Sequence, residues 1–178
     1  MELLKVLKCR KSVRSYTGAV SEQDVQDMLY AGAAAPVGRG KFETMHMTVV
    51  ENKELLEKLD RNAAEFMGDL SRRPLYGAPR LILISSKIAE GGNCLGNVQY
   101  SNAAIMAEHM ALAAIQKGLG SCLIWGAVAA LNTKPELLKE LGLPDGHVVC
   151  CGVVFGETEE ELPERDIDTD RISVSYVK

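Results

Sequence analysis

The chain has 178 residues, 47% of them hydrophobic and 25% charged, which is typical of one soluble domain with a substantial core, so we treat residues 1–178 as a single domain. The formal net charge of -4 argues against general nucleic-acid binding, which needs a basic surface. The five cysteines are odd in number and lack Cys-x-x-Cys spacing, so we expect reduced thiols in a cytoplasmic protein rather than a disulfide framework or a structural metal.

The sequence shows no pattern typical of a signal peptide or a membrane-spanning segment. The chain begins Met-Glu-Leu-Leu-Lys, with no basic stretch followed by a long apolar run, so no signal peptide is visible. No segment is long enough and free enough of polar residues to predict a membrane span. We therefore expect neither a membrane nor a nucleic acid as a partner.

In the first half of the chain, apolar spacing and capping residues predict five elements. They are a short helix over Leu3–Leu7, a capped helix from Ser21 to about Gly32, a loop over residues 36–40, a strand over Met45–Val50, and a helix that begins after Asn52. Pro74 and Pro79 then mark a break before the next strand.

The second half is more apolar. The predicted elements are a strand over Leu81–Ile84 buried on both faces, a turn at residues 91–93, a helix over Gln99–Lys117, a strand over Cys122–Trp125, a helix closed by Gly142, a strand over His147–Phe155, and a final strand over Ile172–Val177. The helix over Gln99–Lys117 is apolar nearly all round and must be buried on most sides, which a second subunit would achieve in so short a chain.

Mixed helices and strands indicate an α/β or α+β architecture. No Gly-x-Gly-x-x-Gly follows a strand and no Walker-type loop is present, so a Rossmann domain or a P-loop enzyme is poorly supported. The three histidines have no metal-ligand spacing, and we predict no metal site.

One short segment suggests a ligand. If residues 10–16 are extended, Arg10, Ser12 and Arg14 share a face. Two guanidinium groups and a hydroxyl on one face would bind an anion, above all a phosphate. The alternative from spacing alone is a solvated basic turn.

The segment Arg10-Lys11-Ser12-Val13-Arg14-Ser15-Tyr16 resembles the flavin-phosphate motif of the nitroreductase family, Arg-Arg/His-Ser-x-Arg/Lys-x-Phe/Tyr, with lysine at the second position. Two later stretches are also similar to that family. They are Ala34-Ala35-Pro36, before a loop and a strand, and residues 118–126, Gly-Leu-Gly-Ser-Cys-Leu-Ile-Trp-Gly.

The resemblance implies an α+β nitroreductase-like fold, with a mainly antiparallel sheet flanked by helices and a homodimer around the long central helix. It also implies FMN at the subunit interface. Arg10, Lys11 and Ser12 would belong to the phosphate motif, and Arg14 would lie beside the N1–C2=O edge of the flavin, where reduction adds negative charge.

The remaining cofactor-binding assignments also follow from the resemblance. Pro36, Val37 and Gly38 would approach the flavin ring from the partner subunit, although the family's serine and asparagine are replaced in this loop. The backbone of Trp125 and Gly126 would face the N5–O4 edge, while a core aromatic is the alternative for Trp125. Arg165 would help to bind the phosphate, with Arg171 as a rival, and Asn62 is a weaker flavin contact.

No catalytic side chain is assigned, because the hydride chemistry belongs to the cofactor. The resemblance implies an FMN-dependent oxidoreductase that takes hydride from NADH or NADPH and reduces small acceptors such as nitroaromatics, quinones or flavins. Two alternatives stay open. One is a flavin-binding redox sensor without turnover, and the other is a specialised dehalogenase-like or flavin-cleaving enzyme on the same fold.

Overall fold

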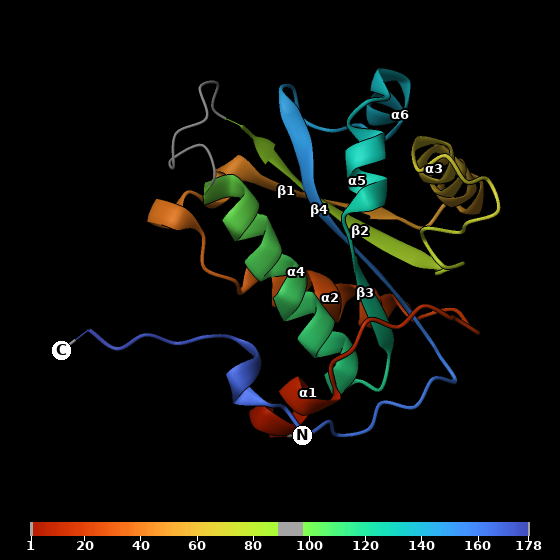
Figure 1. Ribbon diagram of the computed structural model, residues 1–178. Helices are drawn as coiled ribbons and strands as arrows, with labels where there is room; N and C mark the ends of the chain where they lie inside the picture. The colour runs from red at the N-terminus through yellow and green to blue at the C-terminus, as the bar shows by residue number, and fades with distance from the viewer. Residues whose placement is uncertain (1, 89–97, 178) are drawn as a thin grey trace.

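A four-stranded antiparallel sheet forms the centre of the protein in the computed structural model, which describes residues 2–88 and 98–177 (Figure 1). Its strands are β1 (Met45–Val50), β2 (Arg80–Lys87), β3 (Gly120–Ile124) and β4 (His147–Gly156), in the order β1-β2-β4-β3. All three strand pairs are antiparallel. The architecture is therefore α+β, as the resemblance implies.

Helices cover both faces of the sheet (Figure 1). One face carries α2 (Glu22–Ala33) and α4 (Val98–Gln116), with α1 (Leu3–Cys9) against the end of α4. The other face carries α3 (Lys53–Phe66), α5 (Gly126–Leu131) and α6 (Pro135–Glu140). Three short 3-10 turns complete the chain, at Gly38–Gly40, Phe42–Thr44 and Thr169–Arg171.

Strand β2 contributes to both cores, which explains its continuous apolar sequence. Leu81 and Leu83 pack with α3 and α5, whereas Ile82 and Ile84 pack with α2 and α4. Because successive side chains of a strand point to opposite faces, only a strand covered on both sides has this composition. The prediction of a doubly buried strand is confirmed.

The predicted helix starts are confirmed at the atomic level. Ser21 and Asp24 form a reciprocal capping box at the start of α2, and the Asn52 side chain accepts a hydrogen bond from the Leu55 N–H at the start of α3. Each side chain satisfies a backbone donor that the helix itself leaves unpaired.

Two predictions differ from the structure, and a third cannot be compared with it. The strand expected at Cys122–Trp125 runs from Gly120 to Ile124, and the residues after it form helix α5, which was not predicted. Ile172–Val177 is not a strand, because no strand of the described chain lies beside it to pair its backbone. The predicted turn at residues 91–93 lies outside the described residues.

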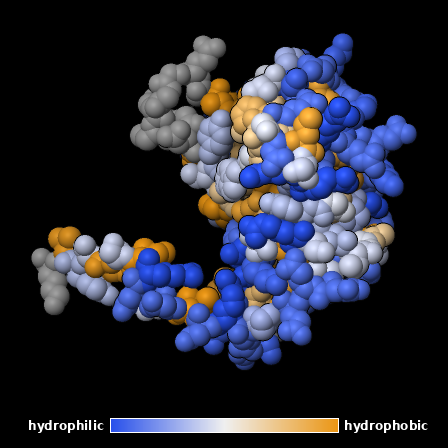
Figure 2. All heavy atoms as spheres, turned by 45° about the vertical axis from the view of Figure 1, so that its right-hand side comes forward, coloured by the Kyte–Doolittle hydropathy of each residue, from blue (hydrophilic) through white to orange (hydrophobic). Residues whose placement is uncertain are grey.

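The C-terminal arm, residues 172–177, instead extends away from the body of the protein (Figures 1 and 2). Its apolar side chains are exposed, and Figure 2 shows hydrophobic atoms along it. Over the described residues, no helix is both long and apolar enough to cross a membrane.

A bulge interrupts the pairing of β2 with β4. The register shifts between Ile84, opposite Cys151, and Ser85, opposite Val149. Cys150 is the extra residue, so Cys150 and Cys151 both pack on the face covered by α4 although they are adjacent in sequence.

Candidate functional site

The segment of residues 10–16 lies along strand β3. The Val13 N–H donates to the Ser121 carbonyl oxygen at 2.9 Å, and the Val13 side chain is completely buried. A Cβ atom at Gly120 would lie 2.6 Å from Val13 Cγ1, so only glycine allows this close approach. Val13 and Gly120 thus fix the motif against the sheet.

The thiol of Cys122 on β3 lies beside the segment of residues 10–16. Burial raises the pKa of this thiol, while the Ser12 hydroxyl and the charges of Arg14 and Arg10 oppose the rise. Arg10 contacts Glu108, whereas Arg14 contacts Tyr76, so the two guanidinium groups have different neighbours.

Arg14 lines a cavity of about 600 Å³. Its guanidinium carbon lies 5.7 Å from the centre of the Tyr76 ring, and the Tyr76 side chain raises the pKa of Arg14. Arg14 is therefore cationic at any physiological pH. The cavity is lined by Arg14, Met67, Arg72, Arg73, Pro74, Tyr76, Gly77 and residues 123–127.

The start of α5 also lines the cavity, through Trp125, Gly126 and Ala127. Trp125 is 52% exposed, so the alternative of a core aromatic is wrong. No side chain caps α5, and Gly126 and Ala127 in its first turn line the cavity, where unpaired N–H groups can bind a ligand.

Lys11 faces a different group from its neighbours in the motif. Its Nζ atom lies 2.9 Å from Glu160 Oε2, and the Arg14 backbone N–H donates to Glu160 Oε1 at 2.8 Å. The Arg14 N–H, followed by Lys11, lowers the pKa of Glu160. Glu160 thus anchors the segment of residues 10–16 through the Lys11 side chain and the Arg14 backbone.

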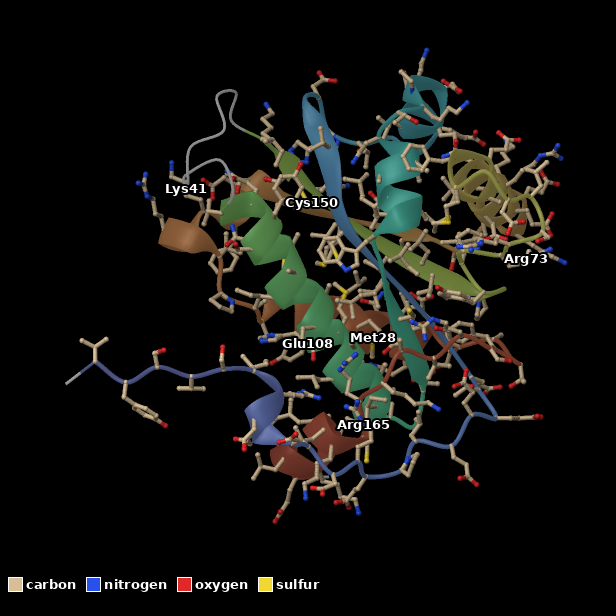
Figure 3. All side chains as sticks on the ribbon, in the orientation of Figure 1. Met28, Lys41, Arg73, Glu108, Cys150 and Arg165 are labelled. Carbon is tan, nitrogen blue, oxygen red and sulfur yellow. The ribbon has the colours of Figure 1, made fainter. Side chains whose placement is uncertain are left out.

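At the other end of the motif, Arg10 is the C-cap residue of α1, and Arg165 lies beside that helix (Figure 3). Arg10 Nε is 3.5 Å from Glu108 Oε1 on α4. The Arg165 guanidinium donates to the Lys8 carbonyl at 2.9 Å and to the Leu7 carbonyl, so it caps the helix that leads into Arg10. The rival Arg171 lies in an exposed 3-10 turn at the base of the C-terminal arm.

The other predicted residues do not line this cavity. Pro36, Val37 and Gly38 follow α2, and the Gly38 N–H donates to the Asn102 side chain near the start of α4. That this loop serves the partner's flavin stays a prediction. Asn62 is buried on α3, outside the cavity.

Sequence reasoning missed the loop between α3 and β2, which contributes Arg72, Arg73 and Tyr76. Tyr76 has a φ of 57°, a left-handed conformation uncommon for a tyrosine. The Asp60 carboxylate on α3 holds the loop by accepting from the Leu75 N–H at 2.6 Å and pairing with Arg73 Nε at 3.0 Å. In the sequence, only the run Arg72-Arg73-Pro74 could have pointed to this loop.

The fold is similar to that of solved nitroreductases. A nitroreductase of Desulfitobacterium hafniense with bound FMN has a TM-score of 0.84 and 25% identity, with both chains covered completely. One from Bacteroides fragilis, also with bound FMN, has a TM-score of 0.79 and 29% identity over 99% of this chain and 100% of that one.

A protein of Archaeoglobus fulgidus, named as a candidate NADH dehydrogenase/NAD(P)H nitroreductase, is 30% identical over 90% of this chain and 87% of its own length. The model of the nitroreductase family matches residues 7–157. The chain belongs to the nitroreductase family.

Proposed function

We propose that this protein is an FMN-dependent oxidoreductase that takes hydride from NADH or NADPH and reduces small acceptors such as nitroaromatics, quinones or flavins. The observation that carries this proposal is the cavity of about 600 Å³ lined by both Arg14 and the uncapped start of α5. The FMN in related solved structures and the nicotinamide named for the curated relatives support it.

The residues of the cavity fit a flavin ring. Arg14 supplies a fixed positive charge for the N1–C2=O edge, and the first turn of α5 supplies N–H donors for the N5–O4 edge. When bound, FMN supplies the two-electron hydride chemistry of the reaction. The side chains bind and orient the ring and form no bond to the substrate.

A phosphate site fits the other end of the motif. Glu108 orients Arg10 through its Nε atom, and among the described residues the Nη groups of Arg10 make no hydrogen bond. Arg165 donates to the carbonyl groups of Leu7 and Lys8, shortly before Arg10, and we assign it to the same phosphate site together with Ser12. Guanidinium pairs of this kind bind phosphate well.

We further propose that the protein works as a cytoplasmic homodimer. Tyr100 and Ile105 on α4 are exposed, as are Leu3 and Leu4 on α1, so both helices have apolar surface left uncovered by this chain. A second copy would bury this surface and bring its own Pro36–Gly38 loop to the flavin. The free cysteines among the described residues fit a reducing compartment.

The test begins with the purified protein. We expect a yellow preparation that releases FMN on denaturation, identified by chromatography. With excess NADH or NADPH and an acceptor, we expect continuous oxidation of the nicotinamide over many turnovers. The acceptors are a nitroaromatic, a quinone and free riboflavin, each assayed with both nicotinamides.

The alternatives give different results. A redox sensor would consume one equivalent of nicotinamide per flavin and then stop. A dehalogenase-like enzyme would release halide from an aryl halide, and a flavin-cleaving enzyme would degrade the flavin itself. A protein that neither contains nor binds FMN would contradict the proposed function entirely.

A further inference from the structure

Two arginines in the cavity exceed what a flavin ring requires. The cavity is lined by Arg14, Arg72 and Arg73, and its lining contains no acidic residue among those described. This local excess of positive charge occurs in a chain whose formal net charge is -4. A cleft lined by one sign of charge attracts ligands of the opposite sign. Arg14 is the cation assigned to the ring edge, and no ligand has yet been assigned to Arg72 and Arg73.

Each of these two arginines forms an ion pair with an aspartate through its Nε atom. Arg73 Nε pairs with Asp60 at 3.0 Å, and Arg72 Nε donates to Asp69 at 3.1 Å. Asp60 is buried and also bonds the loop backbone at Leu75, so its position is fixed. Among the residues that the structure describes, neither arginine uses its Nη groups in a hydrogen bond. Their outer edges are thus available to a ligand.

Apolar groups complete the wall. Trp125 and Met67 line the same cavity and are both exposed, and a Cβ at Gly126 would lie 2.3 Å from the Met67 methyl carbon, so the two sides of the wall approach each other closely. An indole and a thioether are good partners for an aromatic ring. The lining therefore combines a surface for a flat ring with two anchored cations (Figure 3, in which Arg73 is labelled beside α3).

We propose that Arg72 and Arg73 bind an anionic group, a carboxylate or a phosphate, on an aromatic molecule that exchanges electrons at this site, an inference that rests on the proposed function. The group belongs either to the acceptor, as an aryl carboxylate, or to the donor, as the 2′-phosphate that distinguishes NADPH from NADH. Guanidinium groups suit both because they bind such anions through two parallel hydrogen bonds.

For a nitroaromatic acceptor the reaction balances without a contribution from the protein side chains. NAD(P)H supplies a hydride and solvent supplies a proton. The nitro group gains two electrons, one N–O bond breaks, and nitroso compound, NAD(P)⁺ and water are formed. The arginines only bind and orient the anion.

The experiment compares matched substrates. Para-nitrobenzoate and para-nitrobenzamide have nearly the same size, but only the first is charged. For the FMN-loaded protein we expect kcat/KM to favour the benzoate. Arg72→Gln and Arg73→Gln should each lower that preference about five- to tenfold, mainly through KM, because these exposed cations interact less strongly than buried ones. Added salt should weaken the benzoate reaction and not the benzamide reaction.

The control is Arg61→Gln. Arg61 is an exposed arginine paired with Glu65 on α3, outside the cavity lining, and its loss changes the net charge equally. It should leave the preference unchanged. Arg72→Gln leaves the Asp60–Arg73 pair in place, so it tests the charge separately from the fold of the loop.

A second arm compares NADPH with NADH for the same variants. A fall in the NADPH preference with an unchanged benzoate preference supports the inference and assigns the anion to the donor. If neither preference changes, or if the variants lose FMN affinity instead, the inference is overturned while the proposed function stands. Failure of the wild-type protein to bind FMN overturns both.

Discussion

Arg10 and Arg14 are four residues apart in one motif, but their surroundings differ. Arg10 lies against the Glu108 carboxylate near α1, whereas Arg14 lies over the Tyr76 ring in the cavity. The two arginines should therefore affect different properties of a bound flavin, one its affinity and the other its reduction potential.

Replacing Arg10 should weaken cofactor binding through the phosphate alone. Arg10→Ala removes a hydrogen bond to a charged group, which contributes about 1.5–3 kcal/mol. The dissociation constant of FMN should rise about tenfold or more. Riboflavin, which lacks the phosphate, serves as the control ligand and should bind equally to both proteins in a fluorescence titration. Equal losses for the two ligands would show that Arg10 is a structural residue.

Replacing Arg14 should change the reduction potential more than the affinity. A unit charge about 4 Å from the reduced ring contributes at most about 4 kcal/mol at an effective dielectric constant near 20, and solvent should leave about 1–2 kcal/mol. Arg14→Gln should therefore lower the two-electron potential of bound FMN by about 20–45 mV. A redox titration measures this value. An unchanged or higher potential at full FMN occupancy would contradict a position at the ring edge.

At the scale of elements, Glu160 links the segment after β4 to the motif, and this link should depend on pH. Its pKa is lowered below 4.5 by the Arg14 N–H and then by Lys11, so the ionised form stabilises the fold above that pH. The stabilisation is lost as pH falls through the lowered pKa.

Glu160→Gln should lower the free energy of unfolding at neutral pH by less than about 1 kcal/mol, because the pair is partly exposed. Below about pH 4.5 the difference between wild type and variant should shrink, since the wild-type carboxylate becomes protonated there. Urea unfolding at several pH values measures both. A difference that grows in acid would mean that the pKa of Glu160 is raised rather than lowered.

Elements with a local signal could be predicted from the sequence. Met45–Val50 and the caps at Ser21 and Asn52 were predicted correctly because alternation and capping depend on neighbouring residues. Helix α5 was missed because six small and apolar residues without a cap have no readable period. Ile172–Val177 alternates like a strand, but a strand also needs a partner, and no described strand lies beside these residues.

In the candidate site, too, residues with a local sequence pattern could be predicted, and residues positioned by distant contacts could not. The alternation of Arg10, Ser12 and Arg14 could be read directly, and the resemblance added the flavin. Arg72, Arg73 and Tyr76 reach the cavity only because Asp60, on another element, holds their loop. Contacts between distant parts of the chain leave no local pattern to read.

At the scale of the whole molecule, the exposed apolar side chains of α1 and α4 are the basis of the proposed dimer. We expect light scattering to give a dimer at micromolar concentration, with an interface on the order of 2,000–5,000 Å². Leu4 on α1 is 72% exposed, and Leu4→Asp should shift the protein toward monomer. Leu70→Asp, at a leucine that is 67% exposed after α3 on the other face of the sheet, is the matched control and should not. A monomeric wild-type protein would contradict the shared flavin sites.

The bulge in β4 has a consequence for thiol chemistry. It turns both Cys150 and Cys151 under α4, where burial raises their pKa values to about 11 and 12. Thiolate is therefore scarce, and an alkylating reagent such as iodoacetamide can reach these sulfurs only when α4 separates from the sheet. Their rate of alkylation, resolved by peptide mass spectrometry, should report how often this half of the protein opens under native conditions. Saturating FMN should slow that rate, because a ligand bound only to the closed form stabilises it.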